Sequence, residues 1–225
     1  MTRSALVGPV IVFDCDGTLV DSQYSIHGAM ARAFAVAGLA EPAPDAVRRV
    51  VGLSLKEAIG RLLLPDQQGL VPRIDEAYRR SFFELRSAPG HHDPLYPGVG
   101  ELLAELRERG LALGIATGKS MRGLLALLDA HGMTAHFATL QTADRHPGKP
   151  DPAMLRAAMM ELNAVPAETL LVGDTSYDME MAVNAGVRGL GVAWGYHPAD
   201  ELRAAGASGI LAVPADLVAL LKDKA

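Results

Sequence analysis

The sequence predicts an α/β protein in which a doubly wound parallel sheet forms the core and a helical domain is inserted into it. Two observations predict the core. Short apolar runs alternate with amphipathic segments along most of the chain. Several of these runs are apolar at every position, which is typical of parallel strands covered on both faces. A third observation predicts the insertion, because residues 21–90 show helical patterns and no convincing strand.

Six short apolar runs are the predicted strands, and four helical patterns lie between them. The first strand lies in the run Val7–Phe13, which is too short to span a membrane. In the first helical pattern, leucines recur at helical spacing until Gly110 ends it. This alternation predicts a Rossmann-like sheet. The strands are Val10–Phe13, Leu111–Ala116, Phe137–Leu140, Thr169–Val172, Gly189–Val192 and Gly209–Leu211, and the helices are Pro97–Arg109, Ser120–Ala130, Pro152–Leu162 and Tyr177–Ala185.

The inserted segment carries three predicted helices, Ser22–Val36, Ser54–Leu64 and roughly residues 68–86. Ser54 and Glu57 have the spacing of a capping box at the start of the second helix. We therefore expect a core domain made of residues 1–20 and 91–225, and a cap domain made of residues 21–90. The second connection between them carries Pro89, Gly90 and Pro94, which favours a hinge.

Charge and cysteine content narrow the class of protein. The net charge is −5, which argues against a nucleic-acid partner. The single cysteine, Cys15, allows no intramolecular disulfide and fits a reducing compartment. Residues 20–90 hold nine Lys or Arg and eight Asp or Glu, whereas the rest holds twelve and eighteen. This difference suits a cap that closes over a phosphate at an acidic site, although chance variation of the surface explains it as well. We expect a cytoplasmic monomer or homodimer with no membrane partner.

Residues that can carry chemistry cluster in the segments that directly follow four of the predicted strands. In an open parallel sheet these segments meet at one edge, beyond the carboxyl ends of the strands, where ligands bind. We therefore expect them to form one site. The residues are Asp14 and Asp16 after the first strand, Thr117, Gly118 and Lys119 after the second, Lys149 after the third, and Asp174 and Asp178 after the fourth.

The carboxylates of this set suit phosphoryl transfer. Asp14 can attack phosphorus and form an aspartyl-phosphate, which divides one difficult step into two. Because carboxylates repel a phosphate dianion, a hard cation with oxygen ligands, such as Mg²⁺, is needed to bridge them. In extended backbone Asp16 faces the same side as Asp14, so it can protonate the leaving alkoxide and later accept a proton from water.

The remaining residues of the set can bind the phosphate oxygens. Lys149 supplies a positive charge, while the hydroxyl of Thr117 and the backbone N–H groups that follow it, beginning at Gly118, supply hydrogen bonds. For each of these residues a purely structural role remains an alternative. Lys149 could be an exposed loop lysine, and Asp174 and Asp178 could stabilise the start of a helix. The sequence leaves the roles of Lys119 and Asp144 unassigned.

In these residues the chain resembles the haloacid dehalogenase superfamily and, within it, the phosphoglycolate phosphatase-like group. The resemblance implies a Rossmann-like core with a small α-helical cap inserted after the first motif. It also implies that Asp14, Asp16 and Asp174 are the metal ligands, with Asp16 binding through its backbone carbonyl. The implied roles are nucleophile for Asp14, general acid/base for Asp16, second motif for Thr117, third motif for Lys149, metal ligand for Asp174 and its supporting acid for Asp178.

The predicted function is Mg²⁺-dependent hydrolysis of a small phosphorylated metabolite, with phosphoglycolate favoured. Arg49 and Lys56 are the cap cations expected to bind an anionic leaving group, unless they cover the outer surface of the cap. Pyrophosphate, sugar phosphates and a sugar-phosphate mutase remain open. A phosphonoacetaldehyde hydrolase would use a cap lysine, and Lys56 lies in a similar place, but Asp16 argues against that reaction. A non-catalytic phosphate-binding protein is the alternative from another class.

Overall fold

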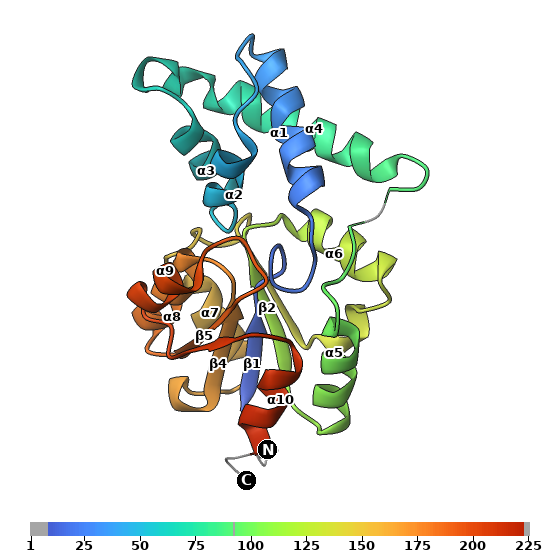
Figure 1. Ribbon diagram of the computed structural model, residues 1–225, viewed down its shortest axis with the longest axis vertical. Coiled ribbons are helices and arrows are strands. Elements are labelled where there is room, and N and C mark those ends of the chain that lie inside the picture. Colours follow the sequence, from blue (N-terminus) through green and yellow to red (C-terminus); the bar gives the residue numbers. More distant parts are fainter. Residues whose placement is uncertain (1–8, 92, 223–225) are drawn as a thin grey trace.

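The computed structural model describes residues 9–91 and 93–222, and its core is a sheet of six parallel strands (Figure 1). The strand order is β3-β2-β1-β4-β5-β6, so the order reverses at β1. The six predicted strands are confirmed, with ends displaced by up to two residues because pairing with neighbours, and not apolarity alone, sets where a strand begins. Val7 and Gly8 of the first apolar run lie outside the described residues. The strands are β1 Val10–Phe13, β2 Leu113–Thr117, β3 Thr139–Thr142, β4 Thr169–Gly173, β5 Arg188–Val192 and β6 Gly209–Leu211.

Helices cover both faces of this sheet. Ile11 and Phe13 of β1 pack on one face with leucines of three helices, α5 Val99–Glu108, α6 Met121–Ala130 and α10 Ala215–Lys222. Val10 and Val12, which point the other way, pack with α7 Ala153–Glu161 and α8 Ser176–Ala185. The short helix α9 Ala199–Ala204 lies against β5 and α8. Short 3₁₀ turns, Thr134–His136 and Pro166–Glu168, precede β3 and β4.

The segment between β1 and α5 folds into helices that stand above the sheet in Figure 1. Helices α1 and α4 pack along each other, and a separate apolar cluster fills the space between these helices and their shorter neighbours. The predicted third helix is divided, because a 3₁₀ turn precedes α4. The elements are α1 Gln23–Val36, α2 Pro44–Val50, α3 Leu55–Leu62, the 3₁₀ turn Pro65–Leu70, and α4 Val71–Ser87.

Two antiparallel connections join this helical segment to the core. The N–H of Asp21 donates to the carbonyl of Pro94 at 2.9 Å, and the N–H of Tyr96 donates to the carbonyl of Leu19 at 3.0 Å. Because the helical segment has its own apolar core and these two connections, we propose that residues 21–90 are a cap on a core of residues 1–20 and 91–225. The terminal residues 1–8 and 223–225, and His92 in the second connection, lie outside the described residues.

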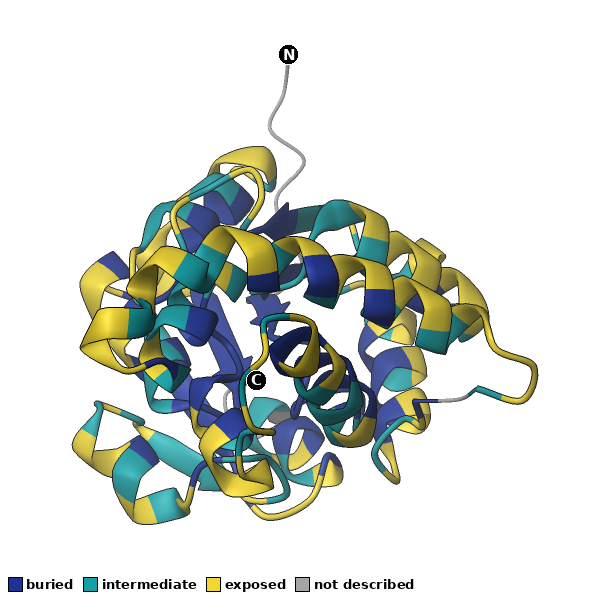
Figure 2. Ribbon diagram, turned by 90° about the horizontal axis from the view of Figure 1, so that it is seen from above, coloured by how far each residue is buried: buried dark blue, intermediate teal, exposed yellow. Residues whose placement is uncertain are grey.

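The surface of the helices is divided as expected for amphipathic elements. In Figure 2 the sides that face the sheet or the cap interior are buried and the outer sides are exposed. Among the helices of residues 9–91 and 93–222, none has the length and apolarity that crossing a membrane requires.

Candidate active site

Three adjacent strands place the central residues of the site. Asp14 follows β1, Thr117 ends β2 and Asp174 follows β4, and β1 pairs with both other strands. The N–H of Asp14 donates to the carbonyl of Val172 at 2.9 Å, so the sheet fixes the backbone of the predicted nucleophile. Asp14 and Thr117 are each 1% exposed and Asp174 is fully buried. The topology thus brings Asp14 together with residues that lie more than a hundred positions further along the chain.

Lys149, from the loop between β3 and α7, is completely buried between two carboxylates. Its Nζ lies 2.8 Å from Asp14 Oδ1 and 2.6 Å from Asp178 Oδ1. Burial alone would lower the pKa of the lysine, but the two carboxylates outweigh it and raise the pKa. The reading of Lys149 as an exposed loop residue is therefore wrong.

Oxygen atoms of Asp14, Asp174 and Asp178 gather closely enough to hold a metal ion. One carboxylate oxygen of each lies within 4.8 Å of the others. Asp14 Oδ2 is buried and accepts no hydrogen bond from the described residues. Burial raises the pKa of Asp14 to about 7, although Lys149 lowers it and Asp178 raises it further. Burial, together with the negative charges of Asp14 and Asp178, raises the pKa of Asp174 well above its ordinary value. A hard divalent cation would stabilise the ionised forms, so the residues fit one.

Glycines make room for these acids. A Cβ on Gly17, whose φ is +83°, would lie 2.1 Å from Asp174 Oδ2. A Cβ on Gly195 would lie 2.1 Å from Asp174 Cβ, and one on Gly173 would lie 2.4 Å from Asp178 Cγ. No side chain fits at such distances, and the acids can therefore occupy these positions only beside glycine.

Helix α8 begins at a capping box that holds Asp178. Thr175 is the N-cap, and its N–H and hydroxyl donate to Asp178 Oδ2 at 3.1 and 2.6 Å. Asp174 is therefore not the N-cap of α8, and the alternative interpretation that gave it this role is wrong. Its Oδ1 accepts from the hydroxyl of Thr18 at 2.9 Å and its Oδ2 from the N–H of Tyr196 at 2.9 Å. The sequence analysis does not identify Thr18 and Tyr196, because they approach Asp174 only in the folded chain and no spacing along the sequence indicates it.

Asp16 lies beside the acidic cluster, with its carboxylate turned to other partners. Asp16 Oδ1 lies 2.7 Å from Lys119 Nζ and also accepts a hydrogen bond from Ser22 Oγ. The side chain of Asp16 is not one of the three grouped around the candidate metal position. This arrangement leaves its backbone carbonyl as the group that the resemblance assigns to the metal.

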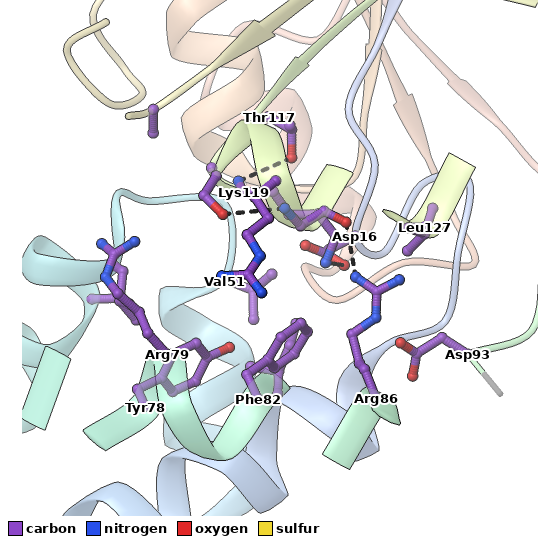
Figure 3. Close-up of a pocket in the computed structure, with 18 of the residues that line it drawn as sticks. Asp16, Val51, Tyr78, Arg79, Phe82, Arg86, Asp93, Thr117, Lys119 and Leu127 are labelled. Carbon is purple, nitrogen blue, oxygen red and sulfur yellow. Dashed lines mark hydrogen bonds and ion pairs between the residues drawn. The ribbon is translucent and has the colours of Figure 1, made fainter. Parts of the chain in front are cut away.

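A cavity of about 920 Å³ lies between the core and the cap (Figure 3). Core residues Asp14, Asp16, Thr117, Gly118 and Lys119 line one side. Figure 3 shows Tyr78, Phe82 and Arg86 of α4 projecting toward them from the cap. The cap side is lined mainly by Val47, Val50, Val51, Gly52, Leu53, Ser54, Tyr78, Arg79, Phe82 and Arg86.

The loop between α2 and α3 docks directly on the core. A Cβ on Gly118 would lie 2.6 Å from the carbonyl oxygen of Leu53, and one on Gly148 would lie 2.9 Å from Ser54 Cβ. Ser54 is the N-cap of α3, but its side chain makes no capping hydrogen bond. The predicted capping box of Ser54 and Glu57 is therefore wrong. Ser54 packs against the core, and Glu57 instead pairs with Arg61 at 2.9 Å.

The two predicted cap cations lie in different places. Arg49 forms a partly exposed ion pair with Glu201 of α9, and it is not among the described residues that line the cavity. The hydroxyl of Tyr177 also donates to the carbonyl of Arg49 at 3.0 Å. These contacts join the cap to the core. Lys56 is exposed and does line the cavity.

Lys119, which the sequence left unassigned, belongs to the site. Its side chain is 7% exposed, and its Nζ lies 5.2 Å from the centre of the Phe82 ring. Burial alone would lower its pKa, but Asp16 outweighs this effect and the pKa is raised. Asp144 has a structural role, because it accepts hydrogen bonds from the N–H of Met121 at the start of α6.

The aromatic and cationic residues of α4 were also missed. Tyr78, Phe82 and Arg86 recur every fourth residue, and the Tyr78 and Phe82 rings stack with centres 5.6 Å apart. This spacing places them on one face of a helix. The pattern alone does not say whether that face meets the cap interior or the cavity.

Comparisons with known proteins agree with this site. The family model described as haloacid dehalogenase-like hydrolase matches residues 11–192. A probable phosphatase, IndB, of Dickeya dadantii is 41% identical over 204 residues, covering 88% of this chain and 86% of that protein. A phosphoglycolate phosphatase of Vibrio parahaemolyticus is 30% identical, covering 87% and 88%. The crystal structure of a hydrolase from Pseudomonas syringae has a TM-score of 0.83 at 28% identity and covers 96% of this chain and 99% of that one. The chain therefore belongs to the haloacid dehalogenase-like hydrolases, and it is a phosphatase that resembles the phosphoglycolate phosphatases of that family.

Proposed function

We propose that the protein hydrolyses small phosphate monoesters with Mg²⁺ as cofactor and with Asp14 as the nucleophile. The observation that carries the proposal is the pairing of Asp14 with Lys149, beside Asp174, at the carboxyl ends of adjacent strands. The Asp14 carboxylate is buried beside the fully buried Lys149, and its Oδ2 accepts no hydrogen bond from the described residues. Asp14 and Asp174, with the backbone carbonyl of Asp16, are the proposed metal ligands. When bound, the cation offsets the repulsion between these carboxylates and the phosphate.

The proposed reaction has two steps. Asp14 attacks phosphorus, the ester P–O bond breaks, and Asp16 gives its proton to the leaving alkoxide. Water then attacks the aspartyl-phosphate, Asp16 takes a proton from that water, and the phosphorus–Asp14 bond breaks to release inorganic phosphate. Lys149 and the Thr117 hydroxyl stabilise the phosphate oxygens, together with the N–H of Gly118. The cap limits the entry of water to the cavity.

Phosphoglycolate is the first substrate to test, because the sequence favours it and several relatives are named phosphoglycolate phosphatase. The cavity of about 920 Å³ lies near the top of the range of about 300–1,000 Å³ that is typical of small-molecule sites. It therefore has room for larger esters, such as sugar phosphates and nucleoside monophosphates. Pyrophosphate also belongs in the panel. A cytoplasmic address and a monomeric or dimeric state stay predictions.

The test is an assay of p-nitrophenyl phosphate with Mg²⁺, with a chelator, and with Mg²⁺ restored. We expect activity to disappear in chelator and to return with Mg²⁺. Asp14→Asn keeps the size of the side chain but removes the nucleophile, so turnover is expected to fall to background. Asp66→Asn, on the cap surface, is the matched control. Full activity in chelator contradicts the metal assignment, and activity in Asp14→Asn contradicts the nucleophile.

A further inference from the structure

We infer that Lys119 binds the leaving group, and that it selects esters with a carboxylate on the carbon that bears the phosphate. The substrates of this class are 2-phosphooxy acids, of which phosphoglycolate is the smallest. The inference rests on the proposed function and assigns the part of the site that faces the leaving group.

The position of Lys119 is fixed by three contacts. Its Nζ lies 2.7 Å from Asp16 Oδ1 and 5.2 Å from the centre of the Phe82 ring. Its backbone N–H donates to Thr117 Oγ1 at 3.3 Å (Figure 3). The side chain is 7% exposed, and what remains exposed borders the cavity. An ammonium group has three donors, so one contact with Asp16 leaves donors for a second anion.

The contact with Asp16 determines which part of a substrate Lys119 reaches. A general acid must touch the oxygen that bridges phosphorus and the leaving group. A cation in contact with that acid therefore lies next to the first atoms beyond the bridging oxygen. A carboxylate on the ester carbon is separated from that oxygen by a single carbon atom. Lys119 can consequently hold Asp16 and such a carboxylate together, whereas a carboxylate further along the leaving group lies beyond it.

Three arginines that border the cavity have partners elsewhere, whereas Lys56 lines it as an exposed side chain. Arg79 of α4 pairs with Asp75 at 2.9 Å, and Arg86 donates to the carbonyl of Gly123 at 2.8 Å. The guanidinium of Arg122 lies 4.6 Å from the centre of the Phe83 ring. Arg49, which is not among the described residues that line the cavity, pairs with Glu201. Among the lysines and arginines of the described residues, Lys119 is the one that forms an ion pair with Asp16, the proposed general acid.

The walls beyond Lys119 define how large the acid can be. Val50, Val51 and Leu53 of the cap, with the stacked rings of Tyr78 and Phe82, give the cavity a mainly apolar side. The phosphate and the carboxylate occupy the polar floor, and a substituent on the ester carbon points into this apolar space. We therefore expect larger 2-phosphooxy acids to be accepted as well as phosphoglycolate.

Two matched substrate pairs test the inference. Phosphoglycolate and 2-hydroxyethyl phosphate have similar sizes and differ in the carboxylate. 2-Phosphoglycerate and 3-phosphoglycerate have the same charge and differ in the carbon that bears the phosphate. In the wild type we expect kcat/KM to be higher for the first member of each pair. In Lys119→Met we expect both ratios to fall by about 10- to 100-fold, since a hydrogen bond between charged groups contributes strongly. Arg73→Met, which removes a cap arginine that donates to the carbonyl of Val36, is the charge-matched control.

Several outcomes are distinguishable. Equal losses for both members of each pair in Lys119→Met overturn the inference, because they show that Lys119 acts only on Asp16. A change of the ratios in Lys56→Met, with none in Lys119→Met, overturns it in favour of Lys56. Lys119→Arg, which keeps the charge, is expected to restore part of the first ratio. If the wild type hydrolyses neither p-nitrophenyl phosphate nor any ester of the panel, the proposed function itself fails.

Discussion

Lys149 Nζ lies 2.6 Å from Asp178 Oδ1, a contact between two fully buried and oppositely charged side chains. The other oxygen of Asp178 caps α8 through Thr175, so this one carboxylate anchors both the lysine and a helix. The carboxylate therefore fixes Lys149 where it meets Asp14. Its two roles can be separated by mutation.

Asp178→Asn keeps an acceptor for Thr175 but removes the charge that faces Lys149. Asp178→Ala removes both. We expect both variants to lose activity with Mg²⁺ present, because Lys149 keeps only Asp14 as its carboxylate partner. We also expect Asp178→Ala to be less stable than Asp178→Asn by about 1 kcal/mol, the usual contribution of a helix cap. Urea unfolding measures the difference, and equal stabilities of the two variants contradict the capping role.

Gly17→Ala tests the space that Asp174 needs. The new Cβ would lie 2.1 Å from Asp174 Oδ2, and alanine is also strained at the φ of +83°. Gly38→Ala is the matched control, because its φ is +79° and nothing lies within 4 Å of its Cβ position. We expect both variants to lose about 1–2 kcal/mol from backbone strain. Only Gly17→Ala is expected to lose Mg²⁺-dependent activity, and equal activities in the two variants argue against this account.

Asp16→Asn tests the general acid. The loss in kcat is expected to reach about 10²- to 10⁴-fold for an alkyl phosphate, whose alkoxide needs a proton. The loss for p-nitrophenyl phosphate is expected to be much smaller, because p-nitrophenolate leaves without one. Because the substitution also disturbs the contact with Lys119, the ratio of the two losses is the informative quantity. Similar losses for the two esters would contradict the role of Asp16 in protonation.

Gly118→Ala tests the docking of the cap. Its Cβ would lie 2.6 Å from the carbonyl oxygen of Leu53, so the loop between α2 and α3 must move away from the core. We expect kcat/KM to fall and hydrogen exchange in residues 50–55 to become faster. Gly100→Ala in α5, where nothing lies within 4 Å of the Cβ position, is the control. Unchanged exchange in Gly118→Ala would show that the loop does not depend on this contact.

Arg49→Ala tests the partly exposed ion pair between the cap and Glu201. Exposed pairs contribute about 0–1 kcal/mol, so kcat/KM is expected to change by less than about fivefold. The ratio between phosphoglycolate and 2-hydroxyethyl phosphate is expected to stay the same, because Arg49 pairs with Glu201 and is not among the described residues that line the cavity. A selective loss of phosphoglycolate hydrolysis in this variant would return Arg49 to the substrate site.

Asp144 gives a prediction about pH. Burial alone would raise its pKa, but hydrogen bonds from Thr142 Oγ1 at 2.5 Å and from the N–H of Met121 lower it. A carboxyl whose pKa is lowered on folding stabilises the fold above its unfolded pKa, and this contribution is lost as the pH falls through the folded value. We expect the wild type to melt above Asp144→Asn at pH 7, with the gap narrowing as the pH falls below about 3.9, the ordinary pKa of an aspartate. Thermal melts at pH 7 and at several acidic pH values check it, and a constant gap contradicts it.

The sequence was informative wherever a pattern depends on nearby residues. Apolar runs located the six strands, and the residues after them located Asp14, Thr117, Lys149 and Asp174, because parallel strands end at one edge of the sheet. The predicted capping box of Ser54 is wrong because Ser54 packs against the core. A pattern of neighbouring residues contains no information about that distant contact. The short helix α2 buries only Val47 and Val50, so it left little periodic signal.

By itself the sequence determined the α/β class, the inserted helices and the acidic, hydroxyl and lysine side chains that gather at one edge of the sheet, because hydrophobic period and the order of strands along the chain are properties of the sequence. Only the tertiary structure decided which residues of the inserted helices contact which residues of the core. It turned Arg49 toward Glu201, and it placed Lys119 between Asp16 and Phe82. These contacts join residues that are distant in sequence across the cap and the core. Their geometry depends on how two separately packed units meet, and no spacing along the chain encodes that.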